Sequence, residues 1–196
     1  MIKTLRMVNF KSFKDTTIDF TGQKGKPKKL AFIYGENGAG KSNIISAFLF
    51  LSRSLLTLYS LRKVEEWMRI QAKAASPSFK NGFDGYRNLE NLAKEAQMIG
   101  TENEPMKLSF EFDFKGLLYF YEISFLKGLI VDEALRYPLD NNSVEVFRFS
   151  GHSSKIHHRL FNSEVYKTDL MEKKERYFGK ASFLSILFEE MTQVDF

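Results

Sequence analysis

The octapeptide GENGAGKS has the residue types and spacing of a phosphate-binding loop. Gly35, Gly40, Lys41 and Ser42 satisfy the pattern G-x-x-x-x-G-K-S, and Gly38 adds a further glycine. Glycines let consecutive backbone N–H groups point inward around phosphate oxygens, where side chains would obstruct them. In this motif the lysine reaches the outer phosphates and the serine hydroxyl ligates Mg²⁺. The loop therefore predicts a nucleotide phosphate site with Ser42 as the metal ligand.

A strand before the loop and a helix after it must position these residues. The apolar segment 29–34 predicts the strand, which ends at Gly35. After the loop, apolar residues at helical spacing predict a helix that begins at Lys41, is buried on most sides at its start and breaks near Ser60. The apolar positions are Ile44, Phe48, Leu51, Leu55 and Leu58, with Ile45 and Leu49 beside them. The positive end of such a helix favours bound phosphate.

The rest of the chain predicts mostly strands. Residues 2–10 and 15–20 predict two strands ahead of the loop. In 106–114, apolar and polar residues alternate, which is typical of a half-buried strand. Lys-Gly pairs at 115–116 and 127–128 predict two-residue hairpin turns, so the strands that follow form an antiparallel meander. Near the end, Ser182 predicts a helix N-cap. The inward residues of that helix would be Phe183, Ile186 and Leu187.

Composition limits the classes of protein and of site. With 43% hydrophobic and 15% aromatic residues the chain is globular, and the absence of cysteine excludes disulfides and thiolate metal sites. The N-terminal MIKTLRMVNF carries charges that exclude a signal peptide. The apolar run 44–61 contains Arg53 and five serines and threonines, which favours a buried helix over a membrane span. We therefore expect a cytoplasmic protein with no membrane partner.

The charge distribution leaves two interpretations open. A net charge of +5 permits nucleic-acid binding without establishing it. The lysines of residues 24–29 form the one local basic cluster, which is either a solvated turn between strands or a contact to a phosphate backbone. The three histidines lie in a polar stretch without a nearby acidic residue, so surface histidines are favoured over a metal site. They are His152, His157 and His158.

The phosphate loop and the segment before it resemble a known family. The stretch GENGAGKSN, preceded by VNFKSFKDTTIDF, is similar to the head domain of ABC-type ATPases of the RecF, SMC and OLD (overcoming lysogenization defect) kind. The phrase NF-K/R-S-F at Asn9–Phe13 and the asparagine Asn37 inside the loop carry this resemblance, and the meander is similar to the family's inserted sheet. A further phrase resembles bacterial stand-alone ATPases linked to nucleases in phage defence or DNA repair. Its residues are Tyr119, Tyr121, Ile130, Glu133 and Leu135.

The resemblance implies ATP and Mg²⁺ as cofactors, with Lys11 and Ser12 near the nucleotide. A basic residue in a turn beside a phosphate site also has an electrostatic reason to be there, although a solvated turn lysine remains the alternative for Lys11. The expected cofactor-binding residues are Gly35, Asn37, Gly38, Ala39, Gly40, Lys41, Ser42, Asn43, Lys11 and Ser12.

Three elements that family members use for hydrolysis are not found as such. These are a glutamine at the lobe junction, an LSxG-type signature, and a Walker B strand whose Asp and Glu hold Mg²⁺ and position water. The stretch GLIVDEA, with Asp132 and Glu133, has a residue pattern similar to a Walker B strand. A two-residue hairpin joins it to the strand before it, whereas a parallel neighbour needs a long crossover. We interpret it as a structural strand, assign no catalytic residue and expect little hydrolysis.

We therefore predict an α/β fold, a P-loop NTPase (ABC-ATPase-like) N-terminal lobe with an inserted antiparallel β-meander. The chain 1–196 is expected to be one incomplete ATPase head lobe, made of a P-loop core (1–75), an irregular helical insertion (76–105), an antiparallel sheet (106–165) and a return helix (166–196). The resemblance implies a homodimer of heads in the complete protein, which couples nucleotide state to DNA or a partner nuclease. The alternative is a nucleotide-regulated protein-interaction module without catalysis.

Overall fold

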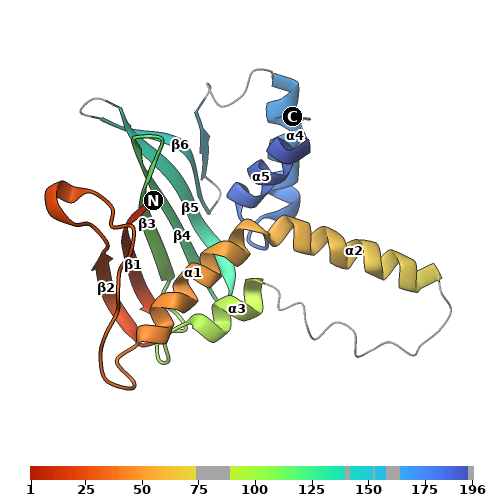
Figure 1. Ribbon diagram of the computed structural model, residues 1–196. Helices are drawn as coiled ribbons and strands as arrows, with labels where there is room; N and C mark the ends of the chain where they lie inside the picture. Colours follow the sequence, from red (N-terminus) through yellow and green to blue (C-terminus); the bar gives the residue numbers. More distant parts are fainter. Residues whose placement is uncertain (74–88, 140–141, 152, 158–163, 194–196) are drawn as a thin grey trace.

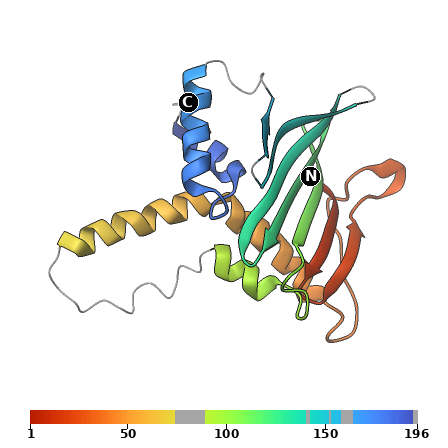
Figure 2. The same ribbon diagram turned by 180° about the vertical axis from the view of Figure 1, so that it is seen from behind.

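A seven-stranded antiparallel sheet, in the order β2-β1-β3-β4-β5-β6-β7, carries the fold (Figure 1). The computed structural model describes residues 1–73, 89–139, 142–151, 153–157 and 164–193. The helix at residues 41–55 crosses one face of the sheet, and the helix at 57–73 projects past the edge of the sheet (Figure 1). The view from behind leaves the other face uncovered (Figure 2). The mixed α/β fold expected from the sequence is confirmed.

The N-terminal strands are β1 (Ile2–Phe10) and β2 (Phe13–Asp19). They form a hairpin in which Phe10 pairs with Phe13, so Lys11 and Ser12 make a two-residue turn. On its other side β1 pairs antiparallel with β3, which joins the N-terminal hairpin to the meander in one sheet. Both predicted N-terminal strands are confirmed, with β2 starting two residues earlier than expected.

The meander consists of β3 (Met106–Phe114), β4 (Leu117–Leu126), β5 (Leu129–Leu139) and β6 (Asn142–Ser150). A short edge strand, β7 (Ser153–Ile156), follows. Both Lys-Gly turns form as predicted, and all four turn residues have positive φ, which suits the twist of a two-residue hairpin. The core lies between this sheet and the helices, where Leu108, Phe110, Ile123 and Phe125 are fully or almost fully buried.

The helices are α1 (Lys41–Leu55), α2 (Thr57–Lys73), α3 (Leu89–Ala96), α4 (Glu164–Tyr177) and α5 (Phe183–Gln193). A 3-10 turn, η1, spans Gln23–Gly25. The predicted cap of α5 is confirmed, because the Ser185 N–H donates to Ser182 Oγ at 3.0 Å. Within 166–196 the structure has two helices rather than one return helix. Of the expected irregular insertion, 74–88 lies outside the described residues.

The strand predicted at 29–34 is wrong, because this segment belongs to no strand of the sheet. Leu30, Phe32 and Tyr34 are 69%, 70% and 85% exposed, and Ile33, on the alternate side, is 42% exposed. A strand exists only when a neighbour satisfies its backbone groups. Among the described residues, the one bridge of this connection, Thr21 to Pro27, lies before the segment. The segment therefore has the apolar pattern of a strand but no neighbouring strand with which to pair.

The long helix predicted after the loop does break, but at Leu56 rather than near Ser60. There α1 and α2 are bent by 58°. The prediction that α1 is buried on most sides is also wrong, since Ile45 and Leu49 are 61% and 54% exposed. Within the described residues no single helix is long and apolar enough to cross a membrane. By length and composition alone, α1 together with 57–70 passes that test as a bent pair.

Buried hydroxyl groups fix the break between α1 and α2. Ser182 Oγ donates to the Ser54 carbonyl at 2.7 Å, and the Thr57 and Ser185 hydroxyls lie 2.9 Å apart. The Leu58 N–H donates to Ser185 Oγ at 3.3 Å. Ser182 and Ser185, at the start of α5, thus form hydrogen bonds with backbone groups that have no partner within the interrupted helix. This cluster fixes where the helix that follows the loop changes direction.

Candidate functional site

The predicted phosphate loop forms a glycine-rich turn that runs directly into α1. Gly38 and Gly40 have φ values of 88° and 86°, in the left-handed region that favours glycine. Gly35, at φ 159°, is close to extended. The Ala39 N–H donates to the Glu36 carbonyl at 3.2 Å, which closes the turn. Residues 36–39 are all exposed.

Lys41 lies at the first position of α1 and reaches back over the loop. Its Nζ donates to the Gly35 carbonyl at 2.6 Å and the Glu36 carbonyl at 2.5 Å. The ammonium group is therefore held beside the loop at the positive end of a 15-residue helix. Ser42 follows with an exposed side chain. An anion at this position would meet the ammonium, the helix end and the loop N–H groups together.

The turn between β1 and β2 packs against the phosphate loop. Asn43 Nδ2 donates to Ser12 Oγ at 2.8 Å. A Cβ atom placed on Gly40 would lie 2.8 Å from the Phe13 ring and 3.2 Å from Ser12 Oγ, so only glycine fits there. The structure thus brings Ser12 together with the loop. Lys11 precedes it in the same turn, and its backbone N–H donates to the Ala96 carbonyl at 2.6 Å.

Two residues at this site were missed by the sequence reasoning. Phe13 belongs to the NF-K/R-S-F phrase, which does not indicate that its ring fills the space beside Gly40. Asn9 is buried and has a φ of 51°, and the segment 97–105 that contacts it is distant in sequence. The NF-K-S-F phrase was the available signal for both residues. Their contacts depend on elements that the phrase does not include.

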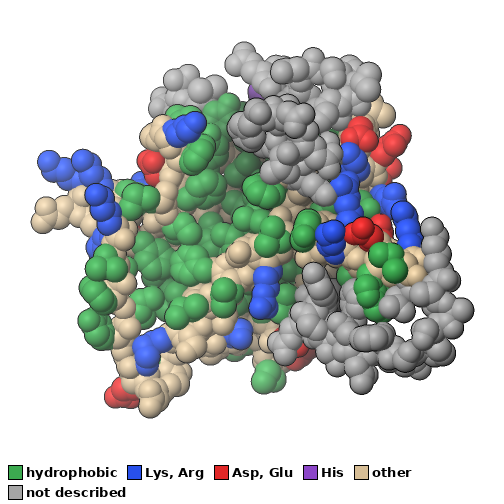
Figure 3. Space-filling model, turned by 45° about the vertical axis from the view of Figure 1, so that its right-hand side comes forward, with side chains coloured by type: hydrophobic (Ala, Val, Ile, Leu, Met, Phe, Trp, Pro, Cys, Tyr) green, Lys and Arg blue, Asp and Glu red, His purple; other side chains and the backbone are tan. Residues whose placement is uncertain are grey.

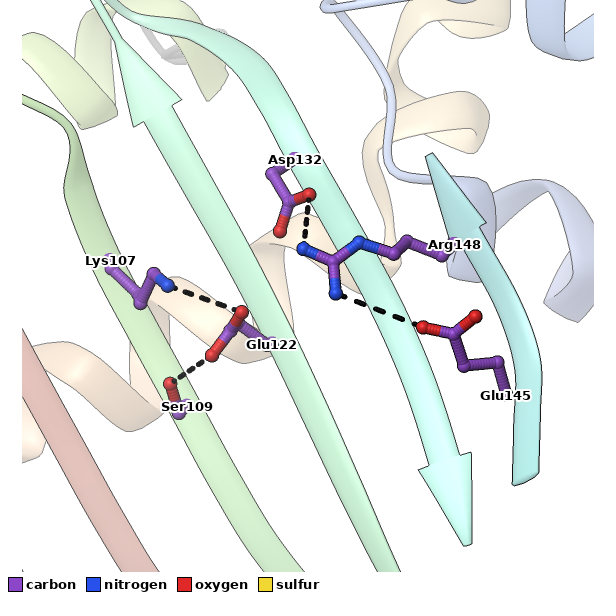
Figure 4. Close-up of polar contacts among 6 residues, drawn as sticks. All are labelled: Lys107, Ser109, Glu122, Asp132, Glu145 and Arg148. Atoms are coloured by element: carbon purple, nitrogen blue, oxygen red, sulfur yellow. Dashed lines mark hydrogen bonds and ion pairs between the residues drawn. The ribbon is translucent and has the colours of Figure 1, made fainter. Parts of the chain in front are cut away.

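The acidic pair of the GLIVDEA stretch lies inside β5, which is antiparallel to both β4 and β6. Asp132 Oδ1 accepts a hydrogen bond from Arg148 at 3.2 Å, and Arg148 also pairs with Glu145 (Figure 4). Lys107 pairs with Glu122 on the same face of the sheet. These ion pairs cover the face away from the helices. The interpretation of this stretch as a structural strand is confirmed.

Glu133 points to the opposite face and caps α5. Its Oε2 accepts the Phe183 N–H at 2.6 Å, and its Oε1 accepts the Leu184 N–H and the Tyr121 hydroxyl, each at 3.0 Å. Burial away from water raises the pKa of the Glu133 carboxyl from 4.5 to about 7, against the lowering effect of these donors. Burial and the Glu133 charge raise the pKa of Tyr121. Both carboxylate oxygens are thus engaged in holding a helix.

The remaining candidate clusters do not converge on the loop. Within the described part of the chain, no group of three or more His, Cys, Asp or Glu side chains could hold a metal ion. His152 and His158 lie outside the described residues, and the His157 N–H donates to the Val146 carbonyl in the β6–β7 region. The lysines of 24–29 are exposed around the η1 turn. Their side chains are therefore open to an anionic partner.

Apolar side chains next to the loop are exposed. Figure 3 shows hydrophobic side chains gathered over a broad area of one face of the molecule. The exposed apolar residues on either side of the loop, which we call the apolar surface, are Leu30, Phe32, Ile33, Tyr34, Ile45 and Leu49. Exposed apolar areas of this kind usually mark an interaction site.

Comparisons with known proteins match the chain to a family model and to longer relatives. The family model described as an AAA domain matches residues 4–115. The DNA double-strand break repair Rad50 ATPase of Sulfolobus acidocaldarius is 31% identical over 136 residues, which cover 60% of this chain and 15% of that protein. An ATP/GTP phosphatase of Helicobacter pylori is 48% identical over 52 residues, covering 26% of this chain and 12% of that protein. The chain thus spans a small part of these relatives.

Proposed function

The chain belongs to the AAA domain family, as an ATPase head of the SMC/RecF-like kind, and from this membership we propose a function for it. It binds ATP with Mg²⁺ and forms the N-terminal lobe of the ATPase head. One observation carries the proposal. The Lys41 ammonium lies over a loop whose two left-handed glycines turn its backbone toward the N-terminus of α1. This combination of a positive charge, a helix N-terminus and a glycine-rich backbone turn suits phosphate oxygens.

The site residues divide by role. Backbone groups of the loop would hold the phosphates, Lys41 would neutralise the outer phosphate charge, and Ser42 would ligate Mg²⁺. The loop residues are Gly35, Asn37, Gly38, Ala39 and Gly40. Ser12 and Asn43, joined by a 2.8 Å hydrogen bond, would border the nucleotide with Lys11 beside them. Bound Mg²⁺ supplies charge neutralisation of the phosphates.

Hydrolysis by this chain alone is expected to be low. Hydrolysis needs a carboxylate that orients the attacking water. Asp132 pairs with Arg148, and Glu133 accepts three hydrogen bonds within the core, so neither carboxylate suits that role. The water-positioning carboxylate would therefore come from a further lobe or chain.

The apolar surface supports completion by such a lobe. The segment 30–34 is apolar on both of its alternating sides, which is typical of a strand buried on both faces in a parallel sheet. A parallel neighbour strand would bring its carboxyl end to the loop, where a Mg²⁺-holding Asp is required. In the complete protein we propose that two such heads pair around ATP.

Coupling of nucleotide state to DNA or a partner nuclease is the last part of the proposal. It is supported by the Rad50 relative, whose name assigns that protein to DNA double-strand break repair, and by the exposed lysines of 24–29. The apolar surface equally favours a second candidate, a nucleotide-regulated interaction module without catalysis. Turnover that appears on mixing with a partner supports the split enzyme, and binding without turnover supports the module.

Calorimetric titration of Mg²⁺-ATP into the wild-type chain, Lys41→Ala and Lys155→Ala tests the proposal. Lys155 lies on β7, at the sheet edge opposite β2, and serves as the matched control. We expect binding in the wild type and in the control, loss of binding in Lys41→Ala, and little phosphate release from any of them. Equal binding by the wild type and Lys41→Ala overturns the phosphate site. Robust phosphate release that depends on Lys41 overturns the proposal that this chain lacks a complete hydrolytic site.

A further inference from the structure

We propose that Asn9 is a positioning residue of the nucleotide site, which sets the Lys11–Ser12 turn against the phosphate loop. Asn9 acts through Lys11 and Ser12 rather than by touching phosphate. The inference rests on the proposed nucleotide binding. It links the segment 96–105, between α3 and β3, to the site.

Asn9 marks the point at which β1 changes its neighbour. Val8 is the last residue of β1 that pairs with β3, opposite Lys107, whereas Phe10 bridges to Gln97. Asn9 makes this change with a φ of 51°, in the left-handed region that a non-glycine residue adopts at a cost. Asparagine tolerates this conformation better than most residues. Its side chain is only 5% exposed.

Both hydrogens of the Asn9 amide are used. Nδ2 donates to Glu104 Oε2 at 3.2 Å and to the Pro105 carbonyl at 3.1 Å. The Asn9 carbonyl accepts the Met98 N–H at 2.8 Å. The side chain and backbone of Asn9 are therefore both tied to the segment that leads into β3.

The turn that follows is held from the same side. Lys11 also has a left-handed φ of 51°, and its N–H donates to the Ala96 carbonyl at 2.6 Å, at the end of α3. Asn9 and Lys11 thus have positive φ on either side of the fully buried Phe10. For Lys11 this conformation belongs to its place as the first residue of a two-residue hairpin turn. Asn9 lies within β1 and outside the turn, so its strained conformation is the one that the contacts from residues 96–105 hold in place.

The direction of the turn decides where its side chains meet the loop. Ser12 accepts the hydrogen bond from Asn43, and Phe13 contacts Gly40. Release of the Asn9 anchor would therefore rotate Lys11 and Ser12 relative to the loop while leaving the loop sequence intact. The expected consequence is weaker nucleotide binding in a chain that still folds.

Asn9→Asp tests this inference with little change in side-chain volume. It replaces the donating amide with an acceptor that faces the Glu104 carboxylate and the Pro105 carbonyl. Because Asn9→Asp loses both amide hydrogen bonds and places a carboxylate beside Glu104, we expect the turn to shift and the Kd for Mg²⁺-ATP, measured by calorimetry, to rise about tenfold. Adding Glu104→Gln returns a donor to the pair and should recover most of the affinity. If Asn9→Asp does not fold, Asn9→Gly keeps the left-handed conformation without the donors and should also weaken binding.

A double-mutant cycle separates positioning from general destabilisation. In a Lys11→Ala/Ser12→Ala background, Asn9→Asp should change the Kd by less than about twofold, because the residues through which it acts are gone. Full weakening in that background overturns the inference, as does unchanged binding by folded Asn9→Asp in the native background. If the wild type binds through Lys41 and Asn9→Asp binds equally, only this inference fails. If the wild type does not bind, the proposed function fails with it.

Discussion

Glu133→Gln should remove a pH-dependent contribution from the stability of the fold. In the wild type, burial raises the pKa of the Glu133 carboxyl from 4.5 to about 7. The folded state therefore holds the proton more tightly than the unfolded state. The contribution of Glu133 to stability is fully present below pH 4.5 and is lost as the pH rises through 7.

The size of the effect follows from that pKa difference. At about 1.4 kcal/mol per unit, a rise from 4.5 to about 7 corresponds to roughly 3 kcal/mol. Most of this falls between pH 5 and pH 8, so the wild type should lose roughly 2–3 kcal/mol across that range through Glu133 alone. Glutamine does not titrate. Because its NH₂ group would replace an oxygen that accepts Phe183 or Leu184, it should also cost about 1–3 kcal/mol at pH 5.

Urea unfolding of both proteins, followed by circular dichroism at pH 5, 6, 7 and 8, measures this difference. We expect the free energy of unfolding of the wild type to exceed that of Glu133→Gln at pH 5, and the excess to shrink or reverse by pH 8. Other groups cancel in the comparison, including Asp15 and Glu145, whose pKa values are lowered by Arg6 and Lys155. A pH-independent difference refutes the reasoning. Phosphate release that Glu133→Gln abolishes without altering stability would show a catalytic carboxylate instead.

Three further predictions concern the loop and its surroundings. Gly40→Ala should abolish Mg²⁺-ATP binding in calorimetry, because its Cβ would lie 2.8 Å from the Phe13 ring; retained affinity would contradict the packing argument. Phe32→Ser and Ile45→Ser should reduce self-association in sedimentation while changing unfolding by no more than about 0.5 kcal/mol, since both side chains are largely exposed; a larger loss would mean that they are packed. Neutralising the lysines of 24–29 should flatten the salt dependence of any DNA affinity, and an unchanged slope would exclude them as phosphate contacts.

The elements that the sequence predicted well are those with local causes. The Lys-Gly pairs at 115–116 and 127–128 supply residues for positive φ within the turn itself, so both hairpins form where expected. The loop before α1 likewise contains its own glycines of positive φ, and α1 begins at Lys41 as predicted. Ser182 caps α5 through a backbone group three residues away. In each case the decisive contact lies within a few residues of its signal.

The errors arise where the decisive contact is distant in sequence. The helix breaks at Leu56, where two serines from the distant α5 region bind its backbone. Ser182, just before α5, donates to the Ser54 carbonyl, and Ser185, within α5, accepts the Leu58 N–H. The residue types of segment 29–34 are typical of a strand, but a strand forms only beside a neighbouring strand, which the local sequence does not provide. Asn9 has a left-handed φ, and its side chain binds the Pro105 carbonyl, which is distant in sequence. The residues next to Asn9 therefore do not predict this conformation.

Asp132 and Glu133 illustrate how topology decides the use of a motif. Consecutive residues in a strand point to opposite faces, and here Asp132 joins the ion pairs of the open face while Glu133 holds α5 on the helical face. Both lie within β5, so their carboxylates diverge and cannot meet at one Mg²⁺. A Walker B pair instead has to act at the carboxyl end of a strand parallel to the one before the loop. In β5 neither carboxylate can take that role, so we propose that a strand from a further lobe pairs with the unpaired segment 30–34 and brings the required Asp to the loop.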